Sequence, residues 1–315
     1  MRSERTPDPS FGLPRDARGA VVTVGTFDGV HRGHWEVLRE IERRARDSGR
    51  RAVLVTFHPH PLTIVKPEIA PALLTTPDEK KEILAESGLD YVVFLRFTPA
   101  LSRMSPETFV ERILVERIGV DELVIGYDHG FGRGRSGDAE TLRTLGRRLG
   151  FEVDVVAPVP MGDDPVSSTR IRKAVAEGRV REAGQGLGRP YSLRGVVVRG
   201  DGRGRQLGFP TANLRLGYGD KLLPAPGVYA VHALLKGGRH AGALHIGPRP
   251  TFQGSAPSVE LHLLDFEPAR ELYGEEIRVD FVERLRGIEA FASVDELVAA
   301  IRADVARTRR ILGGC

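Results

Sequence analysis

Two histidines, His31 and His34, lie where a short apolar run gives way to a helical pattern, in the segment Gly25-Thr26-Phe27-Asp28-Gly29-Val30-His31-Arg32-Gly33-His34. Backbone N–H groups at a helix start lack partners and attract phosphate. Gly29 and Gly33 allow the backbone to approach a ligand closely, and both histidines offer ring donors. Nucleotidyl transfer needs such donors, because charge builds on the α-phosphate and the pyrophosphate. The residues alone leave open a metal pair or two uncommitted histidines on a surface loop.

A second polar run, Ser167-Ser168-Thr169-Arg170-Ile171-Arg172, lies at an expected helix start. Its hydroxyl and backbone N–H groups could hold the outer phosphates of a nucleotide, with an arginine adding positive charge. A run of this kind is also an ordinary helix N-cap.

Two further segments follow predicted strands and therefore lie at the edge where ligands bind. One is the glycine-rich Gly126-Tyr127-Asp128-His129-Gly130-Phe131-Gly132-Arg133. The other is Phe57-His58-Pro59-His60-Pro61. Each is either a binding segment or a rigid loop.

The second half of the chain has its own candidate site, which begins with a glycine- and arginine-rich stretch at 200–208 and continues to Thr211 and Asn213. Residues two apart on an extended segment point the same way, and hard oxygen ligands of this kind suit Mg²⁺. Glu260, on a predicted strand, could orient and deprotonate a substrate hydroxyl. The alternative interpretations are a structural hairpin for the glycine- and arginine-rich stretch and a solvent-exposed surface residue for Glu260.

The elements that position the first set of residues alternate between strand and helix. The sequence predicts strands at 20–25, 52–57, 91–97, 122–126 and 151–157, and helices at 33–48, 76–87, 105–118 and 138–149. This βαβ pattern predicts a doubly wound α/β domain with a parallel sheet, which binds ligands at the carboxyl ends of its strands.

Beyond residue 190 the pattern changes to short runs separated by turn residues. Strands are predicted at 192–198, 228–235, 241–246, 259–266 and 277–284, and a capping box of Ser293 and Glu296 opens a terminal helix to about Arg310. This favours a small antiparallel β-barrel. Because residues 178–190 are rich in Gly and Arg, we expect a linker there, with domains at 1–182 and 187–315.

Composition narrows the function classes. The net charge of +4 in 315 residues is too small to predict a nucleic-acid partner, and no apolar run predicts a membrane span. The single cysteine, Cys315, excludes a disulfide framework within one chain. We therefore expect a cytoplasmic protein with small-molecule partners, for which an oligomer is not required.

The first-half motifs resemble those of a known family. His31-Arg32-Gly33-His34 matches the HxGH motif of nucleotidyltransferases, and TFDGVHRGH is most similar to the FMN adenylyltransferase domain of bacterial bifunctional riboflavin kinase/FAD synthetases. The resemblance implies catalytic roles for His31 and His34. It also implies ATP or phosphate binding by Gly25, Phe27, Gly29, Gly33, Ser168, Thr169 and Arg172, and flavin-side positions at Asp128, His58 and Pro59. His129 departs from the family's aromatic residue.

The second half resembles riboflavin kinase through the segments Pro210-Thr211-Ala212-Asn213 and Val259-Glu260-Leu261-His262-Leu263-Leu264-Asp265-Phe266. The resemblance implies that Glu260 is the catalytic base and that Thr211 and Asn213 hold Mg²⁺. It also implies that Gly202, Gly204 and Gly208 close over ATP phosphates. His245 and Pro248 depart from the family pattern.

Together these features predict an ATP-dependent enzyme that phosphorylates riboflavin to FMN and adenylylates FMN to FAD. An adenylyltransferase for nicotinamide mononucleotide or phosphopantetheine shares the histidine motif, as does a truncated class I tRNA synthetase. The second-domain motifs argue against both. A non-catalytic flavin- or nucleotide-binding regulator is disfavoured because His34 and Glu260 are present.

Overall fold

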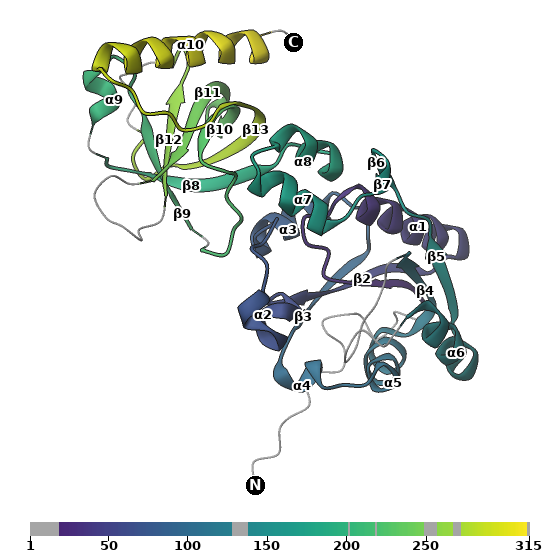
Figure 1. Ribbon diagram of the computed structural model, residues 1–315. Coiled ribbons are helices and arrows are strands. Elements are labelled where there is room, and N and C mark those ends of the chain that lie inside the picture. The colour runs from purple at the N-terminus through teal and green to yellow at the C-terminus, as the bar shows by residue number, and fades with distance from the viewer. Residues whose placement is uncertain are drawn as a thin grey trace. The chain divides into compact units, whose positions relative to one another are not determined.

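The computed structural model describes residues 19–127, 138–200, 202–217, 219–248, 257–266 and 272–313. The chain forms two compact units, 1–167 and 168–315 (Figure 1). Asp128 and His129 lie outside the described residues.

The first unit is built on a five-stranded sheet of order β3-β2-β1-β4-β5. All four neighbouring pairs in this sheet are parallel. The strands are β1 Ala20–Val24, β2 Arg51–His58, β3 Tyr91–Arg96, β4 Val120–Gly126 and β5 Glu152–Val156. This order confirms the predicted doubly wound fold. The chain reverses direction across the sheet at β1, which has β2 on one side and β4 on the other. The loop that leaves the carboxyl end of β1 therefore lies at the topological switch point, where ligands bind in such folds.

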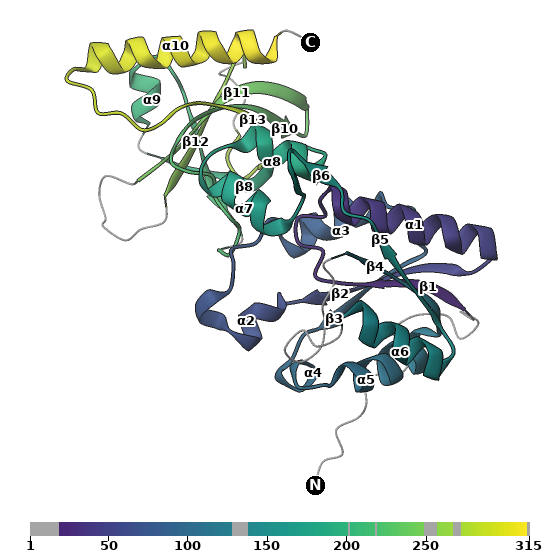
Figure 2. The same cartoon turned by 45° about the vertical axis from the view of Figure 1, so that its right-hand side comes forward.

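Helices cover both faces of the sheet (Figure 2). On one face the helices are α1 Arg32–Ser48 and α3 Pro77–Ala85; on the other are α5 Pro106–Phe109, its π-helical continuation η2 Val110–Ile118, and α6 Ala139–Leu149. Alternate residues along each strand pack against the helices on opposite faces of the sheet. Val21 and Leu54 pack with the α1 side, whereas Val22 and Val55 pack with the α5, η2 and α6 side. The short elements are α2 Pro61–Val65, η1 Pro67–Ile69, α4 Pro99–Ser102, and a hairpin of β6 Pro160–Met161 and β7 Asp164–Pro165.

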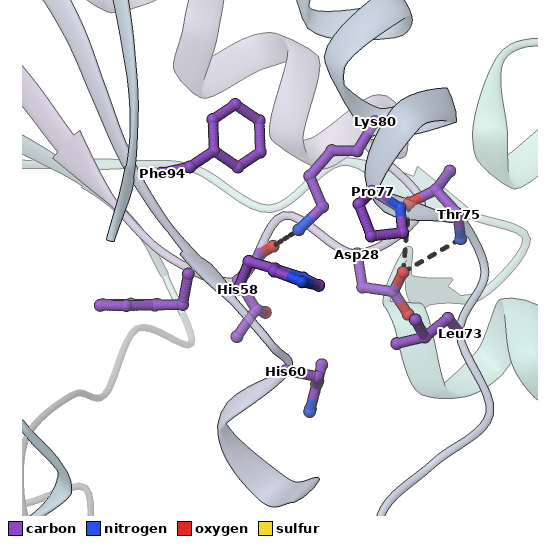
Figure 3. A pocket seen from close by; sticks show the side chains of 10 residues that line it. Asp28, His58, His60, Leu73, Thr75, Pro77, Lys80 and Phe94 are labelled. Carbon is purple, nitrogen blue, oxygen red and sulfur yellow. Dashed lines mark hydrogen bonds between the residues drawn. The ribbon is translucent and has the colours of Figure 1, made fainter. Parts of the chain in front are cut away.

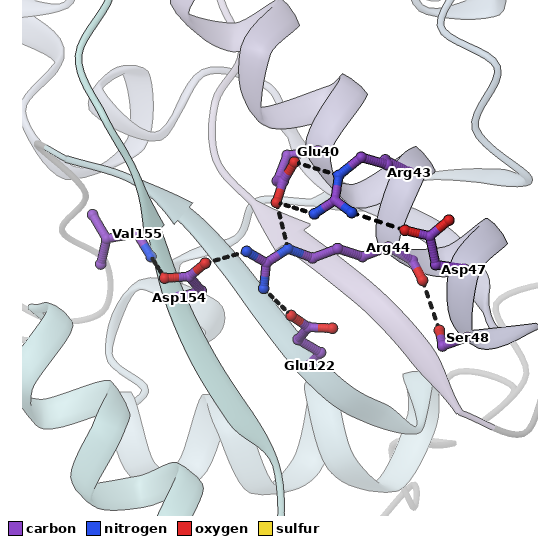
Figure 4. A network of polar contacts seen from close by, with 8 residues as sticks. All are labelled: Glu40, Arg43, Arg44, Asp47, Ser48, Glu122, Asp154 and Val155. Atoms are coloured by element: carbon purple, nitrogen blue, oxygen red, sulfur yellow. Dashed lines mark hydrogen bonds and ion pairs between the residues drawn. The ribbon is translucent and has the colours of Figure 1, made fainter.

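One arginine on α1 ties this helix to the sheet (Figure 4). The guanidinium of Arg44 donates to Glu40 at 2.6 Å and also contacts the carboxylates of Glu122 on β4 and Asp154 on β5. Hydrogen bonds from Arg43 and Arg44 lower the pKa of Glu40 to about 2. The network fixes the far end of α1, so the start of α1 is presented from a firmly seated helix.

The second unit is a closed antiparallel barrel of strand order β10-β11-β12-β9-β8-β13. Its strands are β8 Ser192–Val198, β9 Ala212–Leu216, β10 Gly227–Leu235, β11 Gly238–Gly247, β12 Ser258–Leu263 and β13 Glu276–Arg286. The terminal helix α10 Val294–Leu312 packs against β10, β11 and β13, and a single turn, α9 Arg203–Gln206, lies between β8 and β9. The barrel and terminal helix confirm the predicted fold. The sequence reading missed β9, which it treated only as an extended segment.

The predicted linker at 178–190 was wrong. This stretch contains α8 Val180–Leu187, which packs on α7 Ser168–Ala176 and on β13. Val180, Ala183 and Leu187 are buried at the spacing of one helical face. The glycines suggested a linker. A helix forms instead, because burying the apolar residues on one face stabilises it by more than the low helix propensity of the glycines costs. The boundary between the two compact units lies before α7, between residues 167 and 168. The assignment of one activity to residues 1–182 and the other to 187–315 stays a prediction.

In the part of the chain that the structure describes, no helix has the length and apolar character needed to span a membrane.

Candidate functional site

The two histidines cap the start of α1 reciprocally. His31 is the N-cap residue, and its Nδ1 accepts the backbone N–H of His34 at 3.3 Å. The Nδ1 of His34 accepts the backbone N–H of His31 at 3.2 Å. The imidazole rings stack, with centroids 3.6 Å apart and planes at 15°. A capping box usually uses a hydroxyl and a carboxylate, and here two imidazoles take both parts.

This geometry fixes the tautomer of both rings. A neutral imidazole has one acceptor nitrogen and one donor nitrogen. Because Nδ1 accepts in each ring, the proton lies on Nε2. Each of the stacked rings therefore carries an Nε2–H donor at the positive end of a 17-residue helix. Such an arrangement stabilises negative charge that develops on a phosphate.

The loop before α1 is held in an uncommon conformation. Phe27 and Val30 have φ angles of 47° and 39°, in the left-handed region. For a β-branched residue such as valine this is a true outlier, and strain of this kind persists only where the surroundings determine it. The Phe27 ring stacks on His34 with centroids 4.5 Å apart. A Cβ on Gly33 would lie 3.3 Å from the His31 ring, so the glycine leaves room for that ring.

The segment that leads into α3 anchors this loop (Figure 3). The buried Asp28 carboxylate accepts the backbone N–H groups of Leu74 and Thr75 and the hydroxyl of Thr75. The Gly29 N–H donates to the same hydroxyl at 3.1 Å. Asp28 is therefore a structural anchor, a role that the sequence reading did not assign.

A small, open cleft adjoins this loop. It is lined by Thr26, Asp28, Phe57, His58, His60, Leu73, Thr75, Pro77, Lys80 and Phe94. His58, a predicted flavin-side residue, thus lies in the same cleft as the loop before α1, and His60, the N-cap residue of α2, lies there too. Aromatic rings and the imidazole groups of His58 and His60 in one cleft suit a ligand with both a ring system and a phosphate. The role of Pro59, which follows His58, stays a prediction.

Lys80 is the residue of this cleft that the sequence reading missed. Its side chain is 8% exposed, and its Nζ donates to the Thr26 carbonyl at 2.8 Å. Burial lowers its pKa, and the nearby Asp28 carboxylate partly opposes that shift. The available signal was the capping box of Thr76 and Glu79, which places Lys80 one turn into α3.

The hydroxyl-rich segment begins a helix, as predicted. Ser168 is the first residue of α7, followed by Thr169, with Arg172 one turn later. These residues belong to the second compact unit, and His31 and His34 to the first. Their joint role in phosphate binding stays a prediction.

In the barrel, the strand register brings the predicted kinase residues together. Glu260 on β12 is paired with Asn213 on β9, and the Thr211 hydroxyl lies 3.5 Å from a Glu260 carboxylate oxygen. A Cβ on Gly200 would lie 2.1 Å from the Asn213 side chain, and one on Gly204 would lie 3.1 Å from Thr211 Oγ1. The glycine-rich loop therefore packs directly on both proposed metal ligands.

On the other side of Glu260, β11 places His245 directly opposite in register. Burial lowers the pKa of His245, while the Glu260 carboxylate opposes the shift. Glu260 and His245 are both partly exposed, on the strand face opposite to the barrel interior residues Val259 and Leu261. In the glycine-rich loop, Gly202 and Gly208 have φ angles of 71° and 84°, which turns there require.

Comparisons with known proteins show the family of the chain. The FAD synthetase family model matches residues 13–170, and the riboflavin kinase family model matches residues 187–312. The chain belongs to the bifunctional riboflavin kinase/FMN adenylyltransferase family. The relative from Escherichia coli K12 is 38% identical over 296 residues, covering 94% of this chain and 93% of that protein. The one from Pseudomonas fluorescens is 40% identical, covering 95% of each.

A crystal structure from Streptococcus pneumoniae is similar to this chain over most of its length. It aligns with a TM-score of 0.85 and 32% identity, covering 96% of this chain and 98% of that one. It is described as a macrolide-efflux protein, an activity that neither family model names. Both family models confirm the predicted enzyme class: a bifunctional transferase of flavin cofactor biosynthesis, with riboflavin, FMN and ATP as substrates.

Proposed function

We propose that the two activities occur at two separate sites, one in each unit. The observation that carries this proposal is the pair of stacked histidines at the switch point, with both Nε2–H groups as donors. The barrel has its own constellation of Thr211, Asn213 and Glu260. This scheme needs one copy of the chain and small-molecule substrates, and we propose that the reactions take place in the cytoplasm.

In the first unit, an oxygen of the FMN phosphate attacks the α-phosphorus of ATP. The new P–O bond forms as the bond to the leaving pyrophosphate breaks, so no covalent enzyme intermediate is required. His31 and His34 donate to the oxygens on which negative charge builds. Gly25, Phe27, Gly29 and Gly33 supply the backbone surface for ATP. The residues that we assign to flavin binding, on the family resemblance, are His58, Pro59 and Asp128.

In the barrel, Glu260 accepts the proton of the ribityl 5′-hydroxyl of riboflavin. The resulting oxygen attacks the γ-phosphorus of ATP, and ADP leaves. Gly202, Gly204 and Gly208 shape the loop that covers the phosphates, in keeping with its packing against Thr211 and Asn213.

The donor set of the barrel site fits Mg²⁺. The Thr211 hydroxyl and the Asn213 side chain are hard oxygen donors beside a carboxylate, and they lie under the glycine-rich loop. Thr211 and Asn213 would hold the ion. When bound, Mg²⁺ neutralises charge on the ATP phosphates.

The test is to incubate the full chain with Mg-ATP and riboflavin and to follow FMN and FAD by chromatography. We expect FMN to appear first and FAD to follow. Supplied FMN should yield FAD directly, and nicotinamide mononucleotide and phosphopantetheine should not accept AMP. Transfer to either of those acceptors, or failure to convert FMN, would contradict the proposal.

A further inference from the structure

The phosphate loop at 25–30 needs support from outside itself. Its residues Phe27 and Val30 each occupy a left-handed backbone conformation that persists only where the surroundings hold it. Asp28 and Gly29 are held by Thr75, but both lie after Phe27 in the chain. The peptide that precedes Phe27 must therefore be fixed by other groups.

Two side chains fix that peptide through one atom, the Thr26 carbonyl oxygen. Lys80 Nζ donates to it at 2.8 Å, and the hydroxyl of the buried Thr56 donates at 3.1 Å. Figure 3 shows the Lys80 side chain reaching from α3 to this oxygen. The Lys80 ammonium lies in an unfavourable place, because it is buried and within the first turns of a helix, whose N-terminus repels cations.

The orientation of this peptide decides where the Phe27 N–H points. In a trans peptide the C=O and the following N–H point in opposite directions. With the Thr26 oxygen turned toward Lys80 and Thr56, the Phe27 N–H is turned away from both. Among the described residues, none accepts a hydrogen bond from that N–H. Phe27 is also the residue whose ring stacks on His34.

We propose that Lys80 is a positioning residue for adenylyl transfer: by holding the Thr26 carbonyl, it keeps the Phe27 N–H turned toward the ATP phosphates beside the two histidines. The inference rests on the proposed role of His31 and His34. Lys80 then influences the reaction without contacting the substrate, because it sets the orientation of the peptide group between Thr26 and Phe27.

The first test compares Lys80→Met with Lys81→Met in the full chain. Lys81 is the next residue on α3, and its side chain is 59% exposed. Loss of a fixed donor to a transition state lowers kcat by about 10²–10³-fold, so loosening one should lower it by about 10–100-fold. We expect that loss in kcat for FAD formation by Lys80→Met, with a KM for FMN within about threefold of wild type. Lys81→Met should behave as wild type, and riboflavin phosphorylation by the barrel should be unchanged in both.

The second test separates positioning from direct contact with substrate. Thr56→Val removes the other hydrogen bond to the Thr26 oxygen at nearly constant volume. If both side chains act through that oxygen, Thr56→Val also slows FAD formation, and the double variant loses less than the product of the two single losses. An unaffected Thr56→Val would overturn the positioning role, even if Lys80→Met were inactive or unfolded.

Wild-type FAD formation by Lys80→Met would also overturn the inference. A separate experiment tests the proposed function itself. If a substitution that removes the Nε2–H donor of His34 left FAD formation unimpaired, the proposed role of the histidines would be wrong.

Discussion

The reciprocal histidine cap makes it possible to separate the folding role of His34 from its chemical role. In His34→Asn, the asparagine Oδ1 takes the place of the imidazole Nδ1, because both atoms are bonded to Cγ. It can therefore still accept the His31 N–H that Nδ1 accepts at 3.2 Å. No atom of asparagine reaches the position of Nε2. We expect FAD formation to fall by about 10²–10³-fold, which corresponds to about 2.7–4 kcal/mol of transition-state stabilisation.

His34→Ala should differ from His34→Asn in stability. Both variants lose the ring stack at 3.6 Å, worth about 1 kcal/mol, but only His34→Ala also loses the cap to the His31 N–H, worth about 1 kcal/mol. For a unit of this size each 1 kcal/mol shifts the melting temperature by about 2–4 °C. Thermal unfolding should therefore show a larger drop for His34→Ala than for His34→Asn.

Chromatography of FMN and FAD supplies the matching activity assay. Riboflavin phosphorylation in the barrel serves as the internal control and should be unchanged in both variants. A folded His34→Asn protein that makes FAD at the wild-type rate would refute the donor role. Loss of FMN formation as well would refute two separate sites.

Three further predictions concern the barrel and the metal. Glu260→Gln keeps the shape of the side chain but removes the base, so it should abolish FMN formation while still converting supplied FMN to FAD; loss of both activities in folded protein would contradict this. Chelator should stop both reactions and Mg²⁺ should restore them; stoichiometric zinc or iron in active, chelator-washed protein would be the contrary result. A chain that starts at Ser168 should fold and make FMN, whereas one that starts at Gly186 lacks the buried Val175 and Val180, each worth about 1.5–3 kcal/mol, and should melt at a lower temperature. Equal melting temperatures would show that α7 and α8 do not support the barrel.

Local periodicity was sufficient to predict the first unit. The central strands β1, β2 and β4 are short apolar runs buried on both faces, and the longer helices have a cap or a stop signal at their ends. The capping box of Thr76 and Glu79 and the terminal glycine at Gly49 occur where the sequence places them. The carboxyl ends of the strands could therefore be assigned to the site before any contact was known.

Segments with mixed signals were read less well. In α8, the glycines between 184 and 188 suggested a linker, whereas Val180, Ala183 and Leu187 already had helical spacing. In β9 the strand is short, and only Leu214 is buried, so no apolar run marked it. Its place in the barrel depends on pairing with β8 and β12, which local sequence does not specify.

The contacts that hold the phosphate loop lie beyond any local pattern. Asp28 and Thr75 are 47 residues apart, and Lys80 and Thr26 are 54 apart. They meet because the segment after β2 returns beside the loop that leaves β1, as the sheet order requires. A motif shows which groups can touch phosphate, but the strand order decides which side chains hold those groups still. Residues such as Lys80 therefore become visible only when the fold is known.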